Sequence, residues 1–391
     1  MKFNKLNPFH YLLYIYGFLI FNIVFLLNKV SNKQKQKRVT LYGHRLYGNL
    51  KSIYNELSNT DYQYYFLTLD YKIYKKLKNK SVNVIFGLFP RHIRLVINSK
   101  YIISDHGLHY MKRLLDENDN YFFDANHGLP FQKWNENIMS QFYKYTEVWL
   151  FSKFHKKIYI EEFNHKESNL IVTGYGRLDY LKIFNNIQDQ NLKINEIKSK
   201  FNFPLDKKIV LYAPTWIHDK SKVVNHFMLP NNIEFLKHLN EIAKKNNYLI
   251  IFRPHLNTIF RKKILNKISN FSNILYFPFK EYEEVEEFLL ISDILLTDWS
   301  SISFDFILLD RPVIFLDTPH SFSLGIFMEE YLRFGIVSNL HDLESNIIKY
   351  IDNPNLYHQN YPKQKEFKIQ LYDDINTVVA KKYIERLSKY S

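Results

Sequence analysis

Short apolar runs alternate with helical segments along most of this chain. The runs are rich in Val, Ile, Leu, Phe and Tyr and lack the regular polar–apolar alternation of a half-exposed strand. Such runs are typical of parallel strands that are buried on both faces. The first series contains a predicted helix at 50–57 and predicted strands at 39–43, 64–69, 82–86, 101–105, 121–125, 148–151 and 170–174.

A second series follows a polar segment, at about 180–204, that has helical propensity. Its predicted strands are 208–213, 248–252, 274–277, 294–297 and 313–316, and its predicted helices are 233–245, 283–291, 301–309 and 343–351. The two series predict an α/β, GT-B-like fold, in which two Rossmann-like domains face a cleft. We expect the first domain at 39–180, a connection at 181–207 and the second domain at 208–391.

The N-terminus has a different pattern, because residues 11–27 are apolar except for Gly17 and Asn22. As a helix this segment is about 26 Å long, at the short end of what spans a bilayer. Basic residues follow it more densely than they precede it: Lys29, Lys33, Lys35, Lys37 and Arg38 against Lys2 and Lys5. We therefore predict a membrane-associated helix at 1–30 and a basic linker at 31–38, with the remainder on the cytoplasmic face of a bacterial cell membrane. A spanning helix, an interfacial helix and a helix docked on the protein all stay open.

The charge balance predicts an anionic partner. The chain of 391 residues carries a formal net charge of +14. Its basic residues are widely spread and match no RNA-recognition, zinc-finger or basic-zipper pattern, so we expect no nucleic acid partner. The absence of cysteine excludes disulfides, thiolate metal sites and thiol nucleophiles.

Residues 294–317 carry the most chemical information. They predict a strand, a polar turn, a helix, an Arg-Pro break and a second strand. This order places Asp298, Ser300 and Ser301 where a parallel strand meets a helix. Phosphate groups bind at such positions in open α/β sheets, because unpaired backbone N–H groups converge there. The alternative is that the two serines only cap the helix.

Other candidate residues also follow predicted strands. His127 lies beside Gly128 and Pro130, which favour a turn, and an imidazole suits a general base near neutral pH. The alternative is an ordinary surface histidine.

Two predicted strands of the second domain end in hydrogen-bond donors. Arg253 and His255, on either side of Pro254, suit phosphate oxygens, and Thr215 ends another strand. In the first domain, Arg177 and Gly43 are possible residues of the cleft. The alternative for Arg253-Pro-His255 is an ordinary βα loop.

Several familiar motifs do not occur in the sequence. It has no GxGxxG, GxxxxGK[ST], HExxH or Asp-x-Asp. We therefore expect no cofactor and no metal, with charge neutralised by His, Arg, hydroxyls and helix dipoles.

Taken in order, these motifs resemble the CDP-glycerol glycerophosphotransferase family of teichoic acid and capsule synthesis. The matching elements are His127-Gly128 with Pro130, Gly174-Tyr-Gly-Arg-Leu-Asp179, Tyr212-Ala-Pro-Thr-Trp216, Arg253-Pro-His255, and Thr297-Asp-Trp-Ser-Ser301 through Phe304-Asp-Phe306 to Arg311-Pro312. The chain departs from the family pattern at Gly176, Asn126 and Leu256, where the family usually has Pro, an aromatic residue and Pro.

The resemblance implies a GT-B enzyme that moves a polyol phosphate from a CDP-linked donor to a hydroxyl of a lipid-linked (polyprenyl) acceptor and releases CMP. The first domain would bind the acceptor and the second the donor. His127 would be the base, while His255, Ser300 and Ser301 would hold the donor's phosphates; position alone adds Arg253, Thr215 and Asp298. The alternatives are a nucleotide-sugar glycosyltransferase of the same architecture and a non-catalytic basic membrane-binding protein.

Overall fold

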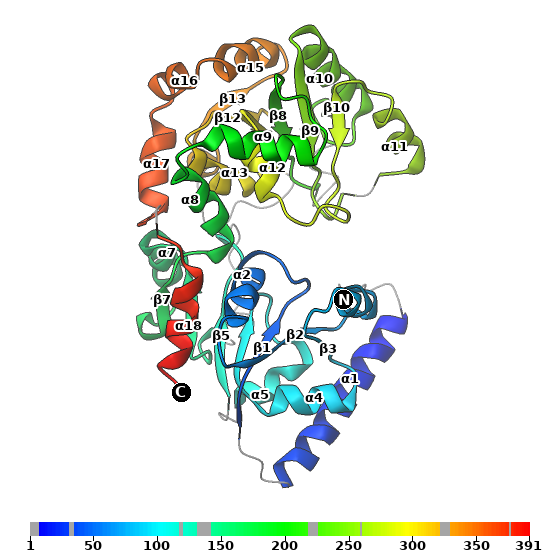
Figure 1. Ribbon diagram of the computed structural model, residues 1–391, viewed down its shortest axis with the longest axis vertical. Coiled ribbons are helices and arrows are strands. Elements are labelled where there is room, and N and C mark those ends of the chain that lie inside the picture. Colours follow the sequence, from blue (N-terminus) through cyan, green and yellow to red (C-terminus); the bar gives the residue numbers. More distant parts are fainter. Residues whose placement is uncertain are drawn as a thin grey trace. The chain divides into compact units, whose positions relative to one another are not determined.

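The computed structural model describes residues 8–30, 35–116, 120–130, 142–217, 226–258, 260–320, 329–374 and 377–391. The chain forms two compact units. Unit 1 comprises Met1–Gly128, Trp134–Asp179 and Val378–Ser391, and unit 2 comprises Leu129–Lys133 and Tyr180–Thr377. Each unit contains one parallel sheet flanked by helices (Figure 1), as the alternating sequence pattern predicts.

Unit 1 holds a seven-stranded sheet in the order β3-β2-β1-β4-β5-β6-β7. Its strands are β1 (Gln36–Tyr42), β2 (Gln63–Thr68), β3 (Val84–Phe86), β4 (Ser99–Ser104), β5 (Tyr121–Asp124), β6 (Glu147–Leu150) and β7 (Leu170–Val172). Its helices are α1 (Pro8–Val30), α2 (Gly48–Leu57), α3 (Tyr71–Asn79), α4 (Pro90–Ile97), η1 (His109–Lys112), α5 (Arg113–Asp116), α7 (Lys153–Phe163), η2 (Glu167–Asn169), η3 (Gly176–Leu178) and α18 (Ala380–Ser388). The strand order reverses between β1 and β4, which is where ligands bind in doubly wound sheets.

Unit 2 holds a six-stranded parallel sheet in the order β10-β9-β8-β11-β12-β13. Its strands are β8 (Lys208–Tyr212), β9 (Tyr248–Phe252), β10 (Ile274–Tyr276), β11 (Ile294–Thr297), β12 (Val313–Leu316) and β13 (Ile336–Ser338). Its helices are α8 (Asp179–Asn185, whose first residue belongs to unit 1), α9 (Gln190–Lys200), α10 (Ile233–Lys245), α11 (Lys262–Ile268), α12 (Glu286–Ile291), α13 (Ile302–Phe306), η5 (Ile307–Leu309), α14 (Glu329–Leu332), α15 (Leu343–Ile351), α16 (Pro354–Asn360) and α17 (Lys363–Leu371). The order reverses between β8 and β11.

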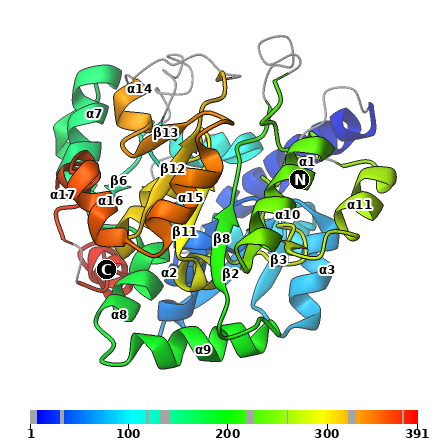
Figure 2. The ribbon, with the colours of Figure 1, turned by 90° about the horizontal axis from the view of Figure 1, so that it is seen from above.

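Both faces of the unit 2 sheet are buried. Alternate strand residues, such as Val210 and Ile250, form one core cluster with residues of α10 and α15, which lie over the same face (Figure 2). The intervening residues, such as Leu211 and Ile251, are equally buried on the opposite face. This two-sided burial explains why the strands read as continuous apolar runs.

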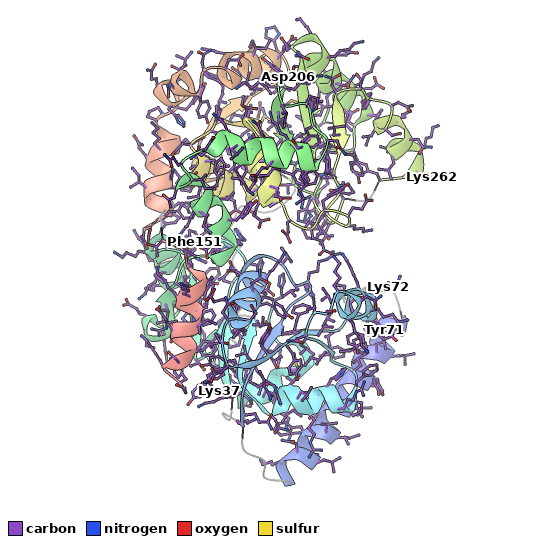
Figure 3. The ribbon with its side chains drawn as sticks, in the orientation of Figure 1. Lys37, Tyr71, Lys72, Phe151, Asp206 and Lys262 are labelled. Atoms are coloured by element: carbon purple, nitrogen blue, oxygen red, sulfur yellow. The ribbon has the colours of Figure 1, made fainter. Side chains whose placement is uncertain are left out.

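The core of unit 1 combines residues from the first part of the chain with residues of the C-terminal helix α18. Residues of α2 and α18 pack against one face of the sheet, where they contact a core cluster that includes Val39, Leu41 and Trp149 of the strands. Tyr383 of α18 stacks on Trp149 with ring centroids 5.0 Å apart. At the end of β6, Phe151 (labelled in Figure 3) packs against Tyr175 at 4.9 Å.

The N-terminal helix α1 packs against α4 and η1 of unit 1. Its inward positions, Gly17, Phe21, Val24, Phe25 and Asn28, are buried and recur at helical spacing, whereas much of the rest of the helix is exposed. The Asn28 and Asn98 side-chain amides form a reciprocal buried pair, with N···O distances of 2.9 and 3.0 Å.

The two residues that interrupt the apolar run in α1 both have structural roles. Gly17 lies on the buried face, and Asn22 accepts a hydrogen bond from Arg113 at 2.8 Å. The Arg113 guanidinium also lies 4.5 Å from the ring centroid of Phe25. Among the described residues, Tyr11–Lys29 is a single helix that by length and composition could cross a membrane.

The structure corrects three sequence predictions. Residues 36–38, predicted within a basic linker, belong to β1. Lys37 pairs with Asp61 at 2.7 Å. Arg38 is buried and donates to Leu95 O at 3.2 Å. Residues 31–34 of that linker lie outside the described residues. The helix predicted at 301–309 is α13 followed by the 3-10 turn η5.

The third correction concerns the end of the chain. Residues 378–391, predicted as part of the second domain, belong to unit 1. The carboxylate of Asp179 accepts hydrogen bonds from the backbone N–H groups of Val379 and Ala380, both at 2.9 Å, and so anchors α18 there. The helical segments predicted at about 180–204 are α8 and α9.

Candidate active site

Three adjacent strands of unit 1 end level and each is followed by a histidine. Tyr42 at the end of β1 pairs with Ser104 of β4, which pairs with Asp124 of β5. The imidazoles that follow these strands form a column: the ring centroids of His44 and His106 are 4.6 Å apart, and those of His106 and His127 are 4.4 Å apart. The rings of His106 and His127 are nearly parallel, with 8° between their planes. We call His44, His106 and His127 the histidine column.

Asp105 binds two members of this column with different groups. Its carboxylate lies 2.6 Å from Nδ1 of His106, and its main-chain carbonyl lies 2.8 Å from Nδ1 of His127. A carbonyl oxygen only accepts, so Nδ1 of His127 carries the hydrogen and Nε2 carries the lone pair. This tautomer gives the ring a basic nitrogen.

The two stacked rings differ in charge preference. His127 reaches solvent, but the protein that surrounds its ring partly desolvates it. This desolvation and the neighbouring His106 both lower the pKa of His127, so the imidazole is neutral at pH 7. Burial alone would lower the pKa of His106, but the hydrogen bond and the charge of Asp105 outweigh burial and raise it. The arrangement therefore favours a cation stacked on a neutral base.

The loop that carries His127 is held by Asn126. Asn126 has a positive φ of 48°, which asparagine tolerates better than most residues. Its side-chain oxygen accepts from the backbone N–H groups of His127 at 2.7 Å and Gly128 at 3.2 Å, and its amide donates to Tyr159 OH at 2.7 Å. Arg177 donates to the carbonyl of His127 at 2.5 Å. The backbone next to the candidate base is thus fixed from two sides.

Gly43 is needed for close approach of the β1 loop to Asp105. A Cβ at this position would lie 2.6 Å from Oδ1 of Asp105 and 2.5 Å from Cδ1 of Leu50. Gly43 is buried, and the next residue, His44, is the one that joins the histidine column. A direct contact of Gly43 with a ligand stays a prediction.

In unit 2, Asp298 joins the loops after β8 and β11 across the reversal of strand order. Its Oδ1 accepts from the backbone N–H groups of Thr215 at 2.7 Å and Trp299 at 2.6 Å. Burial raises the pKa of Asp298, and these hydrogen bonds oppose the increase. A carboxylate repels phosphate, so this geometry favours a positioning role over the predicted contact with the donor.

His255 is oriented as a hydrogen-bond donor. Its Nδ1 accepts from the backbone N–H of Asn257 at 3.1 Å, which leaves the hydrogen of a neutral ring on Nε2. Its ring stacks near that of Trp216, with centroids 6.2 Å apart. This tautomer suits a phosphate oxygen, and the contact of His255 with the donor's phosphates stays a prediction.

The side chain of Arg253 is buried within unit 2. The guanidinium is buried, donates to Phe277 O at 3.4 Å and Glu283 O at 3.3 Å, and lies within 5.6 Å of the rings of Phe279 and Phe288. Burial lowers its pKa to about 10, so the side chain is still charged at pH 7. These contacts favour support of the β9 loop, and a phosphate contact by Arg253 stays a prediction.

Ser300 and Ser301 do not act as side-chain caps. Ser301 is the N-cap of α13 but makes no side-chain cap hydrogen bond, and the carbonyl of Ser300 accepts from Ser303 Oγ at 3.0 Å. α13 has only five residues, so its dipole is small. Any phosphate binding here depends on the hydroxyls and local N–H groups more than on the helix dipole.

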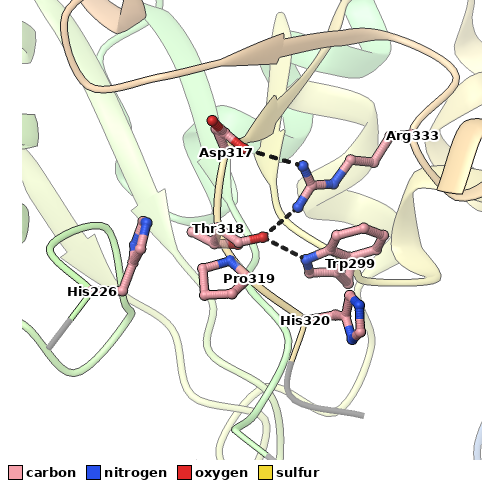
Figure 4. Close-up of a pocket in the computed structure, with 7 residues that line it drawn as sticks. All are labelled: His226, Trp299, Asp317, Thr318, Pro319, His320 and Arg333. Atoms are coloured by element: carbon pink, nitrogen blue, oxygen red, sulfur yellow. Dashed lines mark hydrogen bonds and ion pairs between the residues drawn. The ribbon is translucent and has the colours of Figure 1, made fainter. Parts of the chain in front are cut away.

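Beside this loop, unit 2 contains an open cavity of about 650 Å³ (Figure 4). The Arg333 guanidinium lies 3.6 Å from the ring centroid of Trp299, and Trp299 Nε1 donates to Thr318 O at 2.9 Å. Arg333 also donates to Thr318 O and pairs with Asp317 at 3.6 Å. The lining residues are His226, Trp299, Asp317, Thr318, Pro319, His320 and Arg333. The size is within the range of small-molecule sites.

The predicted site residues thus fall into two groups, one in each unit. Unit 1 brings Gly43, His127 and Arg177 together, and unit 2 places Thr215, His255 and Asp298 on adjacent loops. The sequence analysis missed Asp105, His106 and Arg333. A visible pattern existed for the first two, because Ser104-Asp-His106 ends a predicted strand as Asn126-His127 does. Among the described residues, no group of three or more His, Asp or Glu is placed to hold a metal ion.

Comparison with known proteins identifies a family. Residues 24–323 match the model described as CDP-Glycerol:Poly(glycerophosphate) glycerophosphotransferase. The teichoic acid glycerol-phosphate transferase of Staphylococcus aureus (strain NCTC 8325 / PS 47) is 28% identical over 243 residues, which are 58% of this chain and 59% of that protein. The teichoic acid poly(glycerol phosphate) polymerase of Bacillus subtilis (strain 168) is 34% identical over 146 residues, 37% of this chain and 18% of that protein. The chain therefore spans less than two thirds of the length of these curated relatives.

Solved structures support the fold. The wall teichoic acid polymerase TagF matches with a TM-score of 0.70 and 21% identity, over 94% of this chain and 92% of that chain. The UDP-GlcNAc 2-epimerase from Neisseria meningitidis matches with a TM-score of 0.58 and 16% identity, over 90% and 100%. The predicted GT-B-like class, with two Rossmann-like domains and an apolar N-terminal helix, is confirmed. Because the family model covers most of its length, this chain belongs to the CDP-glycerol glycerophosphotransferase family.

Proposed function

We propose that this protein transfers a glycerol phosphate, or another polyol phosphate, from a CDP-linked donor to a hydroxyl of a lipid-linked acceptor and releases CMP. The place of this reaction is the cytoplasmic face of a bacterial cell membrane, in teichoic acid or capsule synthesis. Family membership supports the reaction class. The structural observation that carries the proposal is the fixed neutral tautomer of His127.

In unit 1, Nε2 of His127 takes the proton of the acceptor hydroxyl. The acceptor oxygen forms a bond to the phosphorus that bears the polyol, the bond from that phosphorus to the CMP oxygen breaks, and the proton stays on His127. A base that is neutral at pH 7 is ready for this step. Phosphoryl transfer otherwise requires mainly positioning and stabilisation of charge on the phosphate oxygens.

In unit 2, donors on the β9 and β11 loops hold the donor's phosphates. Nε2–H of His255 and the hydroxyls of Ser300 and Ser301 supply hydrogen bonds, and Asp298 keeps the β8 and β11 loops in place. The cavity beside Trp299 takes another part of the donor, because it adjoins the same loop.

Helix α1 attaches the enzyme to the membrane that contains the acceptor. One face of α1 packs on unit 1, while large apolar residues elsewhere on it are exposed, including Leu12, Ile15, Leu19 and Ile23. Arg91 and Arg94 on the adjoining α4 and Lys112 on η1 are also exposed. Apolar and basic groups together suit an anionic lipid surface. The buried Asn28–Asn98 pair supports an interfacial helix over one that leaves unit 1 to span the bilayer.

The test is to incubate the purified protein with CDP-glycerol or CDP-ribitol and a polyprenyl-linked acceptor and to measure CMP. Acceptor-dependent CMP release supports the proposal, and no release from either donor counts against it. Turnover of UDP- or GDP-sugars in place of CDP donors would indicate the glycosyltransferase alternative. Lipid binding that survives His255→Ala and Ser300→Ala, without turnover of any nucleotide donor, would indicate a non-catalytic membrane protein.

A further inference from the structure

We propose that His106 binds a phosphate group of the acceptor and thereby places the acceptor hydroxyl beside His127. This inference rests on the proposed function, because it assigns a substrate group to the same site of unit 1. The acceptor must then carry a phosphate near its reactive hydroxyl, as a polyol phosphate terminus does.

The geometry of His106 suits an anion-binding role. Nδ1 of His106 lies 2.6 Å from the Asp105 carboxylate, and its ring lies face to face with that of His127 at 4.4 Å. The imidazolium has a second N–H group at Nε2, on the other side of the ring from Nδ1. Because the two rings are stacked, a group bound to this second N–H lies at the edge of the stack, close to the ring of His127. The ring is partly exposed, so a ligand can reach it.

The charge around the histidine column also suits an anionic ligand. Arg45 and His106 lie on the loops that form this column, and Arg177 of η3 donates to the carbonyl of His127. Two acids oppose them. The carboxylate of Asp105 is hydrogen-bonded to His106, and Asp124 is buried, with its pKa raised to about 7 by burial, so it carries only part of a negative charge at pH 7. His155, whose pKa burial lowers, is neutral. The site therefore has an excess of positive charge that an anionic substrate would balance.

A positive charge on His106 opposes protonation of His127 when no ligand is present. A positive His106 stacked on His127 disfavours a second positive charge, and His127 must become positive when it takes the proton. A phosphate bound to His106 would compensate that charge. Binding of the correct acceptor would then raise the proton affinity of His127 at the moment when the base is needed.

Asp105 gives a sharp way to separate the two imidazoles. Its side chain holds His106, whereas its main-chain carbonyl holds His127. Asp105→Asn therefore removes the charge that favours the His106 cation and leaves the hydrogen bond that fixes the tautomer of His127. His106→Gln removes the cation itself and keeps a neutral donor.

The binding experiment needs no turnover. The full-length protein is labelled with ¹³C at histidine and titrated with glycerol 3-phosphate, inorganic phosphate or CMP, while the imidazole signals and the calorimetric affinity are followed. We expect glycerol 3-phosphate and inorganic phosphate to shift the imidazole signals of His106 and His127 and to raise the pKa of His127. His106→Gln should weaken glycerol 3-phosphate binding about 10- to 100-fold, as for loss of a hydrogen bond to a charged group. Asp105→Asn should weaken it at pH 8 and less at pH 6, where His106 can protonate without Asp105.

The kinetic experiment separates acceptor from donor. His106→Gln should raise the KM for the acceptor by a similar factor and leave the KM for the CDP donor unchanged, and His341→Gln, an exposed histidine of unit 2, should change neither. Unchanged glycerol 3-phosphate affinity and unchanged acceptor KM in His106→Gln would overturn the inference. Absence of CMP release from the wild type would instead contradict the proposed function, and His106-dependent phosphate binding would still support this site.

Discussion

The main-chain carbonyl of Asp105 lies 2.8 Å from Nδ1 of His127 and so decides which nitrogen of that imidazole is basic. The bond does not involve the Asp105 side chain, which holds His106. One residue thus orients two stacked rings, of which His106 has a raised pKa and His127 a lowered one. The following predictions test the consequences of this arrangement and of the equivalent loops in unit 2.

Replacement of His127 should abolish most turnover without loss of donor binding. A general base contributes about 10²–10⁴-fold to a rate, so His127→Ala should lower kcat by about that factor. The affinity for the CDP donor, measured by calorimetry, should stay within error because the proposed donor groups lie on unit 2. Full activity of His127→Ala would show that another group is the base.

The rate should rise with pH on the acid side. Protonated His127 cannot accept a proton, so kcat/KM should increase as pH rises through the pKa of His127, which is below its ordinary value of 6.5. His106→Gln removes a positive neighbour, so this acid limb should move to higher pH. A profile that stays in place in His106→Gln would contradict the charge coupling between the stacked rings.

Asp124→Asn should stabilise the protein at alkaline pH and have little effect at pH 4. Burial raises the pKa of Asp124 from 3.8 to about 7, so the folded state binds this proton more tightly than the unfolded state. The wild type therefore loses stability as pH rises from 3.8 to about 7, by up to about 4 kcal/mol. Asparagine stays neutral and can still accept from Asn126 N. Melting temperatures of both proteins at pH 4 and pH 8 provide the measurement.

Asp298→Ala should weaken donor binding and stability together. It would leave the N–H groups of Thr215 and Trp299 without their acceptor, at a cost of about 1–3 kcal/mol for each buried group. Asp298→Asn retains an oxygen at the same place and should be milder. If Asp298→Ala bound the donor normally and melted at the wild-type temperature, the connection between the two loops would be unimportant.

Charges placed on the exposed face of α1 should release the protein from lipid. Ile15→Glu and Leu19→Glu should reduce flotation with anionic vesicles, because each puts a carboxylate where the apolar residue would contact acyl chains. Ile369→Glu is the matched control, since Ile369 is 78% exposed on α17 of unit 2. Equal loss in all three variants would argue against a specific role of α1.

Much of the fold follows from the sequence pattern. The strands β9, β11 and β12 and the helices α10 and α15 have the predicted bounds, because each apolar segment is bordered by turn residues. The prediction missed α3 and α7 although both have visible caps, Asp70 and Ser152, whose side chains accept from the first turns. It also missed β13, which has three residues and an exposed Val337, too little pattern to recognise.

The site was predictable only in part. His127, Thr215 and Asp298 follow buried apolar strands of four or five residues, so their positions at sheet edges could be inferred from local sequence. The stacking of His106 on His127 depends on the adjacency of β4 and β5, and the pairing of Arg333 with Trp299 joins segments far apart in the chain. Such contacts are set by strand order, which the periodicity of a single sequence does not give.

The return of α18 to unit 1 has a consequence for synthesis. Tyr383 donates to Gly174 O and accepts from Gly176 N, both at 3.0 Å, and Arg386 pairs with Glu147, so these contacts join segments made before and after unit 2. On the ribosome, unit 2 can finish folding while unit 1 still lacks a helix of its core. Until that helix emerges, the nascent protein exposes an apolar surface around Trp149. We expect a chaperone to bind the nascent protein during this period.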